Sequence, residues 1–119
     1  MRDLGGRYAG YTTRLADGVL TQPGHTPPDL RRAIVMRAAG SPSFPLSGTE
    51  RGTAGEALVA YVDKVARHAY QVTDEDFARL KQAGHSDDAL FEVTVSAALG
   101  AALGRLERGL AALRGQQPD

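Results

Sequence analysis

Three side chains in the sequence have the types needed for proton transfer: His68, Tyr61 and Glu92. Histidine ionises near neutral pH, so it can accept and return a proton under physiological conditions. A glutamate buried between helices would have a raised pKa and could share this role. If these groups converged, they would suit proton abstraction, isomerisation or decarboxylation of an organic acid, with Arg105 binding the substrate carboxylate.

Each of these residues also has an ordinary structural interpretation. His68 lies near the end of a predicted helix, where a protonated imidazole interacts favourably with the helix dipole. Glu92 could equally be an exposed residue in the second turn of its helix, and Arg105 could lie on the surface. The residue types leave both interpretations open, and nothing in the sequence requires that the groups converge.

The sequence predicts no metal site. The three histidines, His25, His68 and His85, form no His-x-x-x-His pair, and no Glu-x-x-His pairing is evident. The carboxylates at 74–76 and 87–88 stand at predicted helix starts, where they interact favourably with the positive end of the dipole. We therefore expect no metal and no other cofactor.

The composition excludes several classes of protein. The 119 residues include no cysteine, which removes disulfides, thiolate metal sites, cysteine nucleophiles and thiol peroxidase chemistry. The 14 Lys and Arg residues balance 14 Asp and Glu residues, so no net basic field attracts nucleic acid. A helix-turn-helix over 73–96 is disfavoured because its recognition helix would begin with Asp87 and Asp88, which repel phosphate. We expect no nucleic-acid partner.

We also expect no membrane partner. The longest uninterrupted apolar stretches are far shorter than the ~18 residues of a spanning helix. The first residues carry no apolar run of the kind found in signal peptides. The default expectation is therefore a cytoplasmic protein.

Local signals predict an all-α fold, a compact bundle of four to five helices in one domain over 1–119. Alanine is abundant while valine and isoleucine are sparse, which favours helix over sheet. Thr26 is expected to cap the first clear helix. Residues 1–25 are harder to interpret, because glycines interrupt a weak helical spacing, and they could be loosely packed. The clear helices are predicted over 30–39, 53–69, the stretch between 73 and 84, and 87–114.

The last predicted helix has the clearest pattern. Its leucines alternate in steps of four and three residues, which is a heptad spacing, at Leu99, Leu103, Leu106, Leu110 and Leu113. A second face carries small residues, including Gly100 and Gly104, which let another backbone approach closely. Both faces could pack within the chain. We favour contact with a second subunit, because a helix of about 28 residues is ~42 Å long, whereas such a domain has a radius of gyration of ~13–14 Å. The expected interface comprises Leu99, Leu103, Gly104, Leu106 and Leu110.

The stretch 72–92 contains an acidic cap, a short helix ending in Ala83-Gly84 and the cap Ser86-Asp87-Asp88. A long Ala-rich helix that reaches Arg105-Leu106 follows it. This pattern resembles the alkylhydroperoxidase D-like, or carboxymuconolactone decarboxylase-like, superfamily. Residues 60–67 also resemble the helix before this unit in the peroxidase-related branch, so 53–114 would be the family-like core. The resemblance implies an all-helical bundle that assembles into dimers, trimers or hexamers.

The resemblance does not supply an active site. Active peroxidatic members use a Cys-x-x-Cys pair, a histidine four residues later and a glutamate in a proton relay, and this chain has no cysteine. Tyr61, Lys64 and His68 have the spacing of that motif, but the better alignment places this segment after it. We therefore predict a cysteine-less homo-oligomer that acts as an interaction or accessory module. The alternative is a cofactor-free acid/base enzyme, or a small-molecule binder, that acts on an organic acid.

Overall fold

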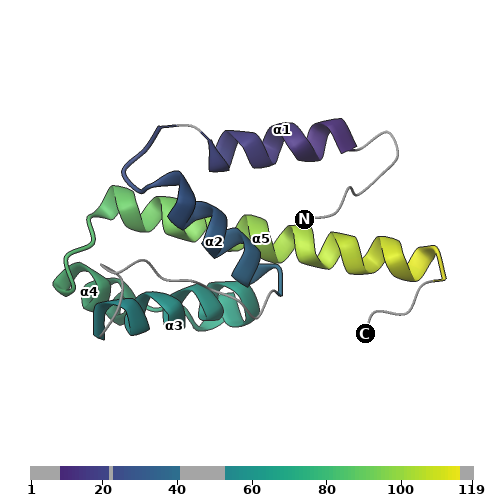
Figure 1. The fold of residues 1–119 in the computed structure, drawn as a ribbon. Coiled ribbons are helices and arrows are strands. Elements are labelled where there is room, and N and C mark those ends of the chain that lie inside the picture. Colours follow the sequence, from purple (N-terminus) through teal and green to yellow (C-terminus); the bar gives the residue numbers. More distant parts are fainter. Residues whose placement is uncertain (1–8, 22, 41–52, 116–119) are drawn as a thin grey trace.

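The computed structural model describes residues 9–21, 23–40 and 53–115. Within these ranges the regular secondary structure is entirely helical, which confirms the all-α prediction (Figure 1). The five α-helices of the described residues agree with the predicted four to five. They are α1 (Ala9–Leu20), α2 (Pro28–Ala38), α3 (Thr53–His68), α4 (Asp74–Gln82) and α5 (Asp87–Leu113), with a 3-10 turn, η3 (Ala69–Gln71), after α3.

Helix α5 is the axis of the molecule. In Figure 1, α2 and α3 pack along it, and α4 lies beside its first turns. Helix α1 lies on the opposite side of α5 from α3. The last turns of α5 project beyond α2 and α3 (Figure 1). The molecule measures 46 × 28 × 25 Å, and its long dimension matches α5, because 27 residues span ~40 Å.

Local signals set the bounds of α4 and α5 as the sequence predicts. The Asp76 carboxylate accepts a hydrogen bond from the Thr73 backbone N–H at 2.9 Å, and the Ser86 hydroxyl accepts one from Ala89 N–H at 3.1 Å. Both bonds satisfy N–H groups that a helix start leaves without partners. Gly84 and Gly115 follow the helix ends with φ of 106° and 76°, a region that glycine adopts without strain.

The expected capping role of Thr26 is wrong. The residue before α2 is Pro27, and no side chain caps this helix. The Thr26 hydroxyl instead donates to the Glu92 carboxylate at 2.5 Å. A hydrogen bond to a charged acceptor is stronger than one between neutral groups. The Thr26 hydroxyl therefore bonds to Glu92 of α5 and does not cap α2.

Two hydrophobic clusters hold the helices together. The main core lies between α2, α3, α4 and α5 and includes Ile34, Leu58, Val62, Leu80, Val93 and Ala97. A smaller cluster joins Val35 of α2 to Leu99 and Leu103 of α5, and its edge is covered by Val19, Leu20 and Leu110. Helix α1 therefore contacts the body through its last turn, while Tyr11 and Leu15 remain exposed. Residues 1–25 were expected to be loosely packed. Of these, residues 1–8 and 22 lie outside the described residues.

Helix α5 is more apolar than its short uninterrupted apolar runs indicate. By length and composition it could cross a membrane, although core helices of water-soluble proteins pass the same test. Half of its apolar window is buried inside the structure. Single polar residues interrupt the apolar runs but leave the helix apolar on most sides.

Candidate functional site

The predicted proton-transfer residue Tyr61 is a buried contact between helices. Its hydroxyl lies 2.6 Å from the Thr94 hydroxyl, which itself donates to the Leu90 carbonyl at 2.7 Å. Tyr61 therefore donates to Thr94, and its ring packs 5.8 Å from the Phe77 ring. Burial is the main cause that raises the pKa of the Tyr61 hydroxyl above its ordinary value. This side chain ties α3 to α4 and α5.

Glu92 points away from that contact. It precedes Thr94 by two residues, and two residues correspond to about 200° around a helix. One carboxylate oxygen accepts from the His25 backbone N–H at 2.6 Å. The other accepts from the backbone N–H and the hydroxyl of Thr26, at 2.8 and 2.5 Å. The carboxylate thus binds the segment between α1 and α2 onto α5.

The pKa of Glu92 moves in the direction opposite to the one expected for a glutamate buried between helices. Partial burial acts to raise the pKa of the carboxyl group, but the three hydrogen bonds and the charge of Arg31 outweigh it, and the pKa is lowered. The group therefore stays ionised at neutral pH and is a poor proton donor. No periodicity in the sequence could show this, because the hydrogen-bond donors lie 66 and 67 residues away.

Gly24 completes the enclosure of this carboxylate. A Cβ atom at residue 24 would lie 2.6 Å from a Glu92 carboxylate oxygen, so any side chain there would displace the carboxylate. Nothing in the sequence pattern marks Gly24, His25 and Thr26 as neighbours of Glu92. The Gly-His-Thr-Pro run looks like an ordinary turn, and only the tertiary structure brings it to α5.

His68 lies apart from both groups. It is exposed at the end of α3, where its ring stands edge-on to Tyr70 at 6.1 Å. It follows Tyr61 by seven residues, about 10 Å along the helix. His68, Tyr61 and Glu92 therefore do not form one site.

Arg105 contacts the chain itself. Its guanidinium donates to the Ala66 carbonyl at 2.8 Å. Ala66 is in the last turn of α3, where carbonyls lack helical partners and a cation is favourable. Arg105 thus joins the end of α3 to α5, and the substrate-binding role expected for it has no support in this geometry.

The residues expected at a subunit interface divide into two groups. Leu99 and Leu103 are buried in the smaller cluster within the chain. Gly104 packs on α2, since a Cβ there would lie 2.7 Å from the Ala39 carbonyl oxygen. Leu99, Leu103 and Gly104 therefore pack within the chain, which is the alternative that the sequence pattern also allowed. Leu106 is exposed, and Leu110 lies at the edge of the smaller cluster.

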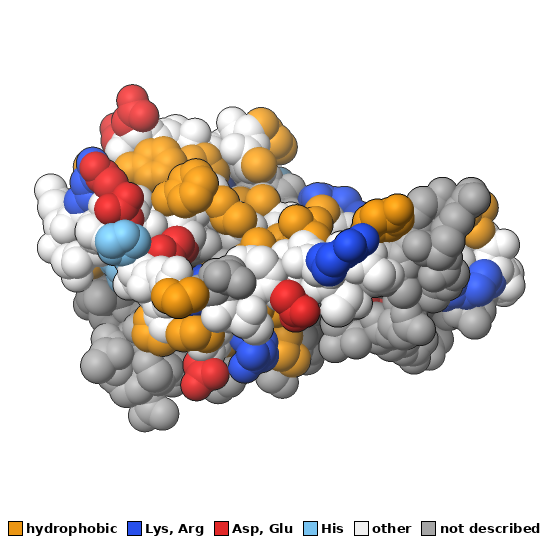
Figure 2. Space-filling view, turned by 90° about the horizontal axis from the view of Figure 1, so that it is seen from above, with side chains coloured by type: hydrophobic (Ala, Val, Ile, Leu, Met, Phe, Trp, Pro, Cys, Tyr) orange, Lys and Arg blue, Asp and Glu red, His pale blue; other side chains and the backbone are white. Residues whose placement is uncertain are grey.

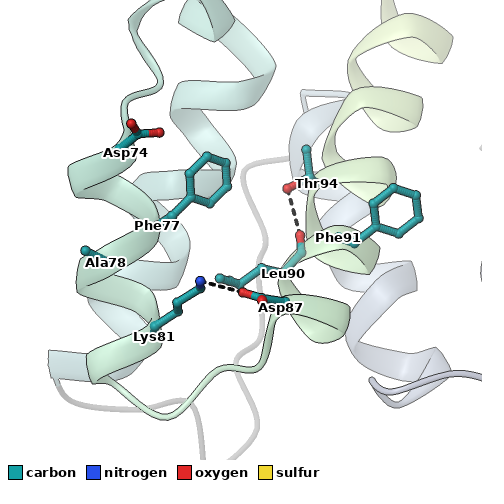
Figure 3. A pocket seen from close by; sticks show the side chains of 8 residues that line it. All are labelled: Asp74, Phe77, Ala78, Lys81, Asp87, Leu90, Phe91 and Thr94. Atoms are coloured by element: carbon teal, nitrogen blue, oxygen red, sulfur yellow. Dashed lines mark hydrogen bonds and ion pairs between the residues drawn. The ribbon is translucent and has the colours of Figure 1, made fainter.

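A groove between α4 and α5 was not anticipated from the sequence. Its volume is about 550 Å³, and Figure 3 shows Phe77 extending from α4 towards α5. At one end Lys81 and Asp87 meet across the gap at 2.7 Å. The groove is lined by Asp74, Phe77, Ala78, Lys81, Asp87, Leu90, Phe91 and Thr94. Such a groove can bind an apolar group, but His68, Glu92 and Arg105 do not line it.

A second hollow lies on the other side of Phe91. It has a volume of about 200 Å³ and is lined by residues from the end of α1, from α2 and from α5, among them Val19, Arg31 and Val95. Phe91 lines both hollows and therefore forms a ridge between them. Within the described residues no group of three or more His, Asp or Glu could hold a metal ion.

Comparisons with known proteins do not add a relative. No family model matches the chain, and neither does any curated protein or solved structure.

Proposed function

We propose that this chain is a non-catalytic helical module that assembles with copies of itself. The observation that supports it is the exposure of large apolar side chains along α5: Phe91 is 69% exposed, Leu106 43% and Leu113 85%. Exposed apolar surface that is continuous along one element is typical of interaction sites. Its removal from water is worth roughly 25 cal/mol per Å².

The contacts of the candidate catalytic groups support a non-enzymatic function. Tyr61, Glu92 and Arg105 each make a separate contact that joins two segments of the chain. In an acid/base site each group must be within hydrogen-bond reach of the substrate proton that it moves. These side chains instead account for how the helices are held together.

The proposal includes the finer fold assignment, a cysteine-less alkylhydroperoxidase D-like bundle. It is supported by the order of the elements: a helix over Thr53–His68, a short capped α4, and the long Ala-rich α5. Assembly into dimers or larger oligomers is what that resemblance implies. The chain holds no cysteine and can contribute no peroxidatic thiol.

The mass in solution tests the assembly. We expect light scattering over a dilution series to give a dimer or a larger assembly at micromolar concentration. Leu106→Gln should weaken it by about tenfold or more, because a symmetric contact loses one leucine from each copy. Tyr70→Gln is the matched control, since Tyr70 is exposed but lies away from α5. A monomer at every concentration would overturn the proposal.

The groove between α4 and α5 favours a second candidate, the binding of a small apolar molecule. The carboxylate of Asp74 lies at its rim, and Lys81 is already paired with Asp87. The groove therefore suits a neutral or cationic compound better than the organic acid that the sequence suggested. Nile red, a neutral dye, should fluoresce in its presence, and Ala78→Trp should reduce the signal by filling the groove. An unchanged signal in that variant would exclude the groove as the binding site.

A further inference from the structure

We propose that two copies of the chain pair through α5 in antiparallel orientation and cross at Ala102. This inference rests on the proposed self-assembly and specifies its surface and orientation. The pairing surface is the outward stripe of α5, which we define as Phe91, Val95, Ala98, Ala102, Leu106, Gly109 and Leu113.

The outward stripe shares only Leu106 and Leu113 with the leucine pattern seen in the sequence. Its steps of four and three residues keep it on one side of the helix. Ala98, Ala102 and Gly109 are exposed like the three large residues, and Val95 is half-buried. A Cβ added at Gly109 would meet no atom of the described residues within 4 Å. Figure 2 shows hydrophobic side chains in a band along the long axis of the molecule.

The spacing of the outward stripe is symmetric about Ala102. Ala98 and Leu106 each lie four residues from it, Val95 and Gly109 seven, and Phe91 and Leu113 eleven. An antiparallel pair that crosses at Ala102 therefore places Ala98 opposite Leu106 of the second copy.

The same register places large residues against small ones further out. Val95 faces Gly109 of the second copy, so a branched side chain meets a bare backbone. A parallel pair would set Gly109 against Gly109 and Leu106 against Leu106. The parallel pair would then have a gap at Gly109 and crowding at Leu106, and both are unfavourable in a closely packed interface.

Charge favours the same orientation. Helix α5 begins with Asp87 and Asp88, its last part carries Arg105 and Arg108 with Glu107 between them, and Arg114 directly follows its end. The Asp88 side chain is 72% exposed. Antiparallel pairing brings each acidic start near the basic end of the second copy, and Arg114 falls within about one turn of Asp88. Parallel pairing would bring like charges together. Such charges determine orientation more than affinity.

The ends of the stripe also fit. Leu113, the most exposed large apolar residue of the described chain, faces Phe91 of the second copy in this register. Phe91 stands between hollows of about 550 and 200 Å³. The leucine side chain thus has space beside the aromatic ring at each end of the pair.

Single cysteines test the register, because the natural chain has none. Ala102→Cys should form a disulfide between two copies under mild oxidation, since the two residues meet at the crossing point and a disulfide needs Cβ atoms within about 4.5 Å. Met36→Cys is the matched control: Met36 is exposed on α2, away from the stripe, and should not form the link. Ala98→Cys should link to Leu106→Cys in a mixed sample. Efficient linking of Ala98→Cys to itself would show a parallel pair and overturn the inference.

A charge exchange gives a second readout that needs no cross-link. Asp88→Arg should weaken assembly by about tenfold, since a symmetric pair loses two such contacts, and adding Arg114→Asp should restore it. No effect of either change would overturn the antiparallel orientation.

The outcomes separate this inference from the proposed function. If the wild-type chain assembles but Ala102→Cys links no better than Met36→Cys, the inference fails and self-assembly stands. If the wild-type chain is monomeric at every concentration, both fail. If it is monomeric and binds phosphatidylcholine vesicles through the stripe, a lipid surface is the occupant and the inference is again overturned.

Discussion

The two faces of α5 have similar residues but different surroundings. On the inner face, Gly104 lies against the backbone of α2, and a Cβ there would be 2.7 Å from the Ala39 carbonyl oxygen. On the outer face, a Cβ at Gly109 would meet nothing within 4 Å in the part of the chain that the structure describes. Small residues therefore allow close packing on the inner face and leave open surface on the outer face. Composition alone therefore does not show which face of an Ala- and Gly-rich helix is covered.

The largest effect should come from enlarging the inner face. Gly104→Leu should destabilise the fold by about 3 kcal/mol, because the new side chain collides with the backbone of α2 at Ala39. Urea unfolding measures it. The sequence pattern instead assigned Gly104 to the expected subunit interface. An unfolding midpoint equal to that of the wild type would show that α2 does not pack here.

Glu92, at the border between the two faces, should have an intermediate effect. Glu92→Gln should cost about 1–2 kcal/mol at pH 7, because a charged acceptor of hydrogen bonds is replaced by a neutral one. The pKa of Glu92 is lowered from its ordinary value of 4.5. Its contribution to stability is therefore present above pH 4.5 and is lost as the pH falls through the folded-state pKa.

Stability against pH provides the check on Glu92. The difference between the wild type and Glu92→Gln should be constant above about pH 6 and shrink below 4.5. Asp63 and Asp76 also have lowered pKa values, because of hydrogen bonds from Arg37 and from the Thr73 backbone respectively. The wild type and Glu92→Gln should therefore both lose stability in acid, and only the difference between their stabilities reports on Glu92. A difference that grows in acid would contradict the proposed ionisation.

The smallest effect should come from the outer face. Gly109→Ala should stabilise the monomer by roughly 0.5–1 kcal/mol, since alanine is the better helix former and space is open there. Thermal unfolding under dilute conditions, where the monomer predominates, measures this. A destabilising result would mean that another part of the chain covers this face.

Much of the fold could be predicted because its signals are local. The bounds of α4 and α5 follow from Thr73, Ser86, Gly84 and Gly115, each of which acts within one helical turn. Thr26 shows the limit of that approach. It has the type of a capping residue, but it donates to Glu92, which lies 66 residues away. A local rule cannot include a partner that only folding brings near.

The candidate site was less predictable. His68, Tyr61, Glu92 and Arg105 have the types that catalysis uses, but the structure engages three of them in separate helix contacts and leaves His68 exposed. The groove between α4 and α5 depends on the angle and distance between two helices. Periodicity within one helix contains no information on either quantity.

The sequence by itself determined the helical class, the ends of the long helix and the absence of thiol chemistry, because propensity, capping and composition are properties of the chain alone. Only the tertiary structure decided which face of α5 is buried and how Glu92 is ionised. The physical reason is the same in both cases. The apolar character of α5 extends around most of the helix, and the pKa of a carboxyl group depends on its neighbours, so both depend on segments that are distant in sequence.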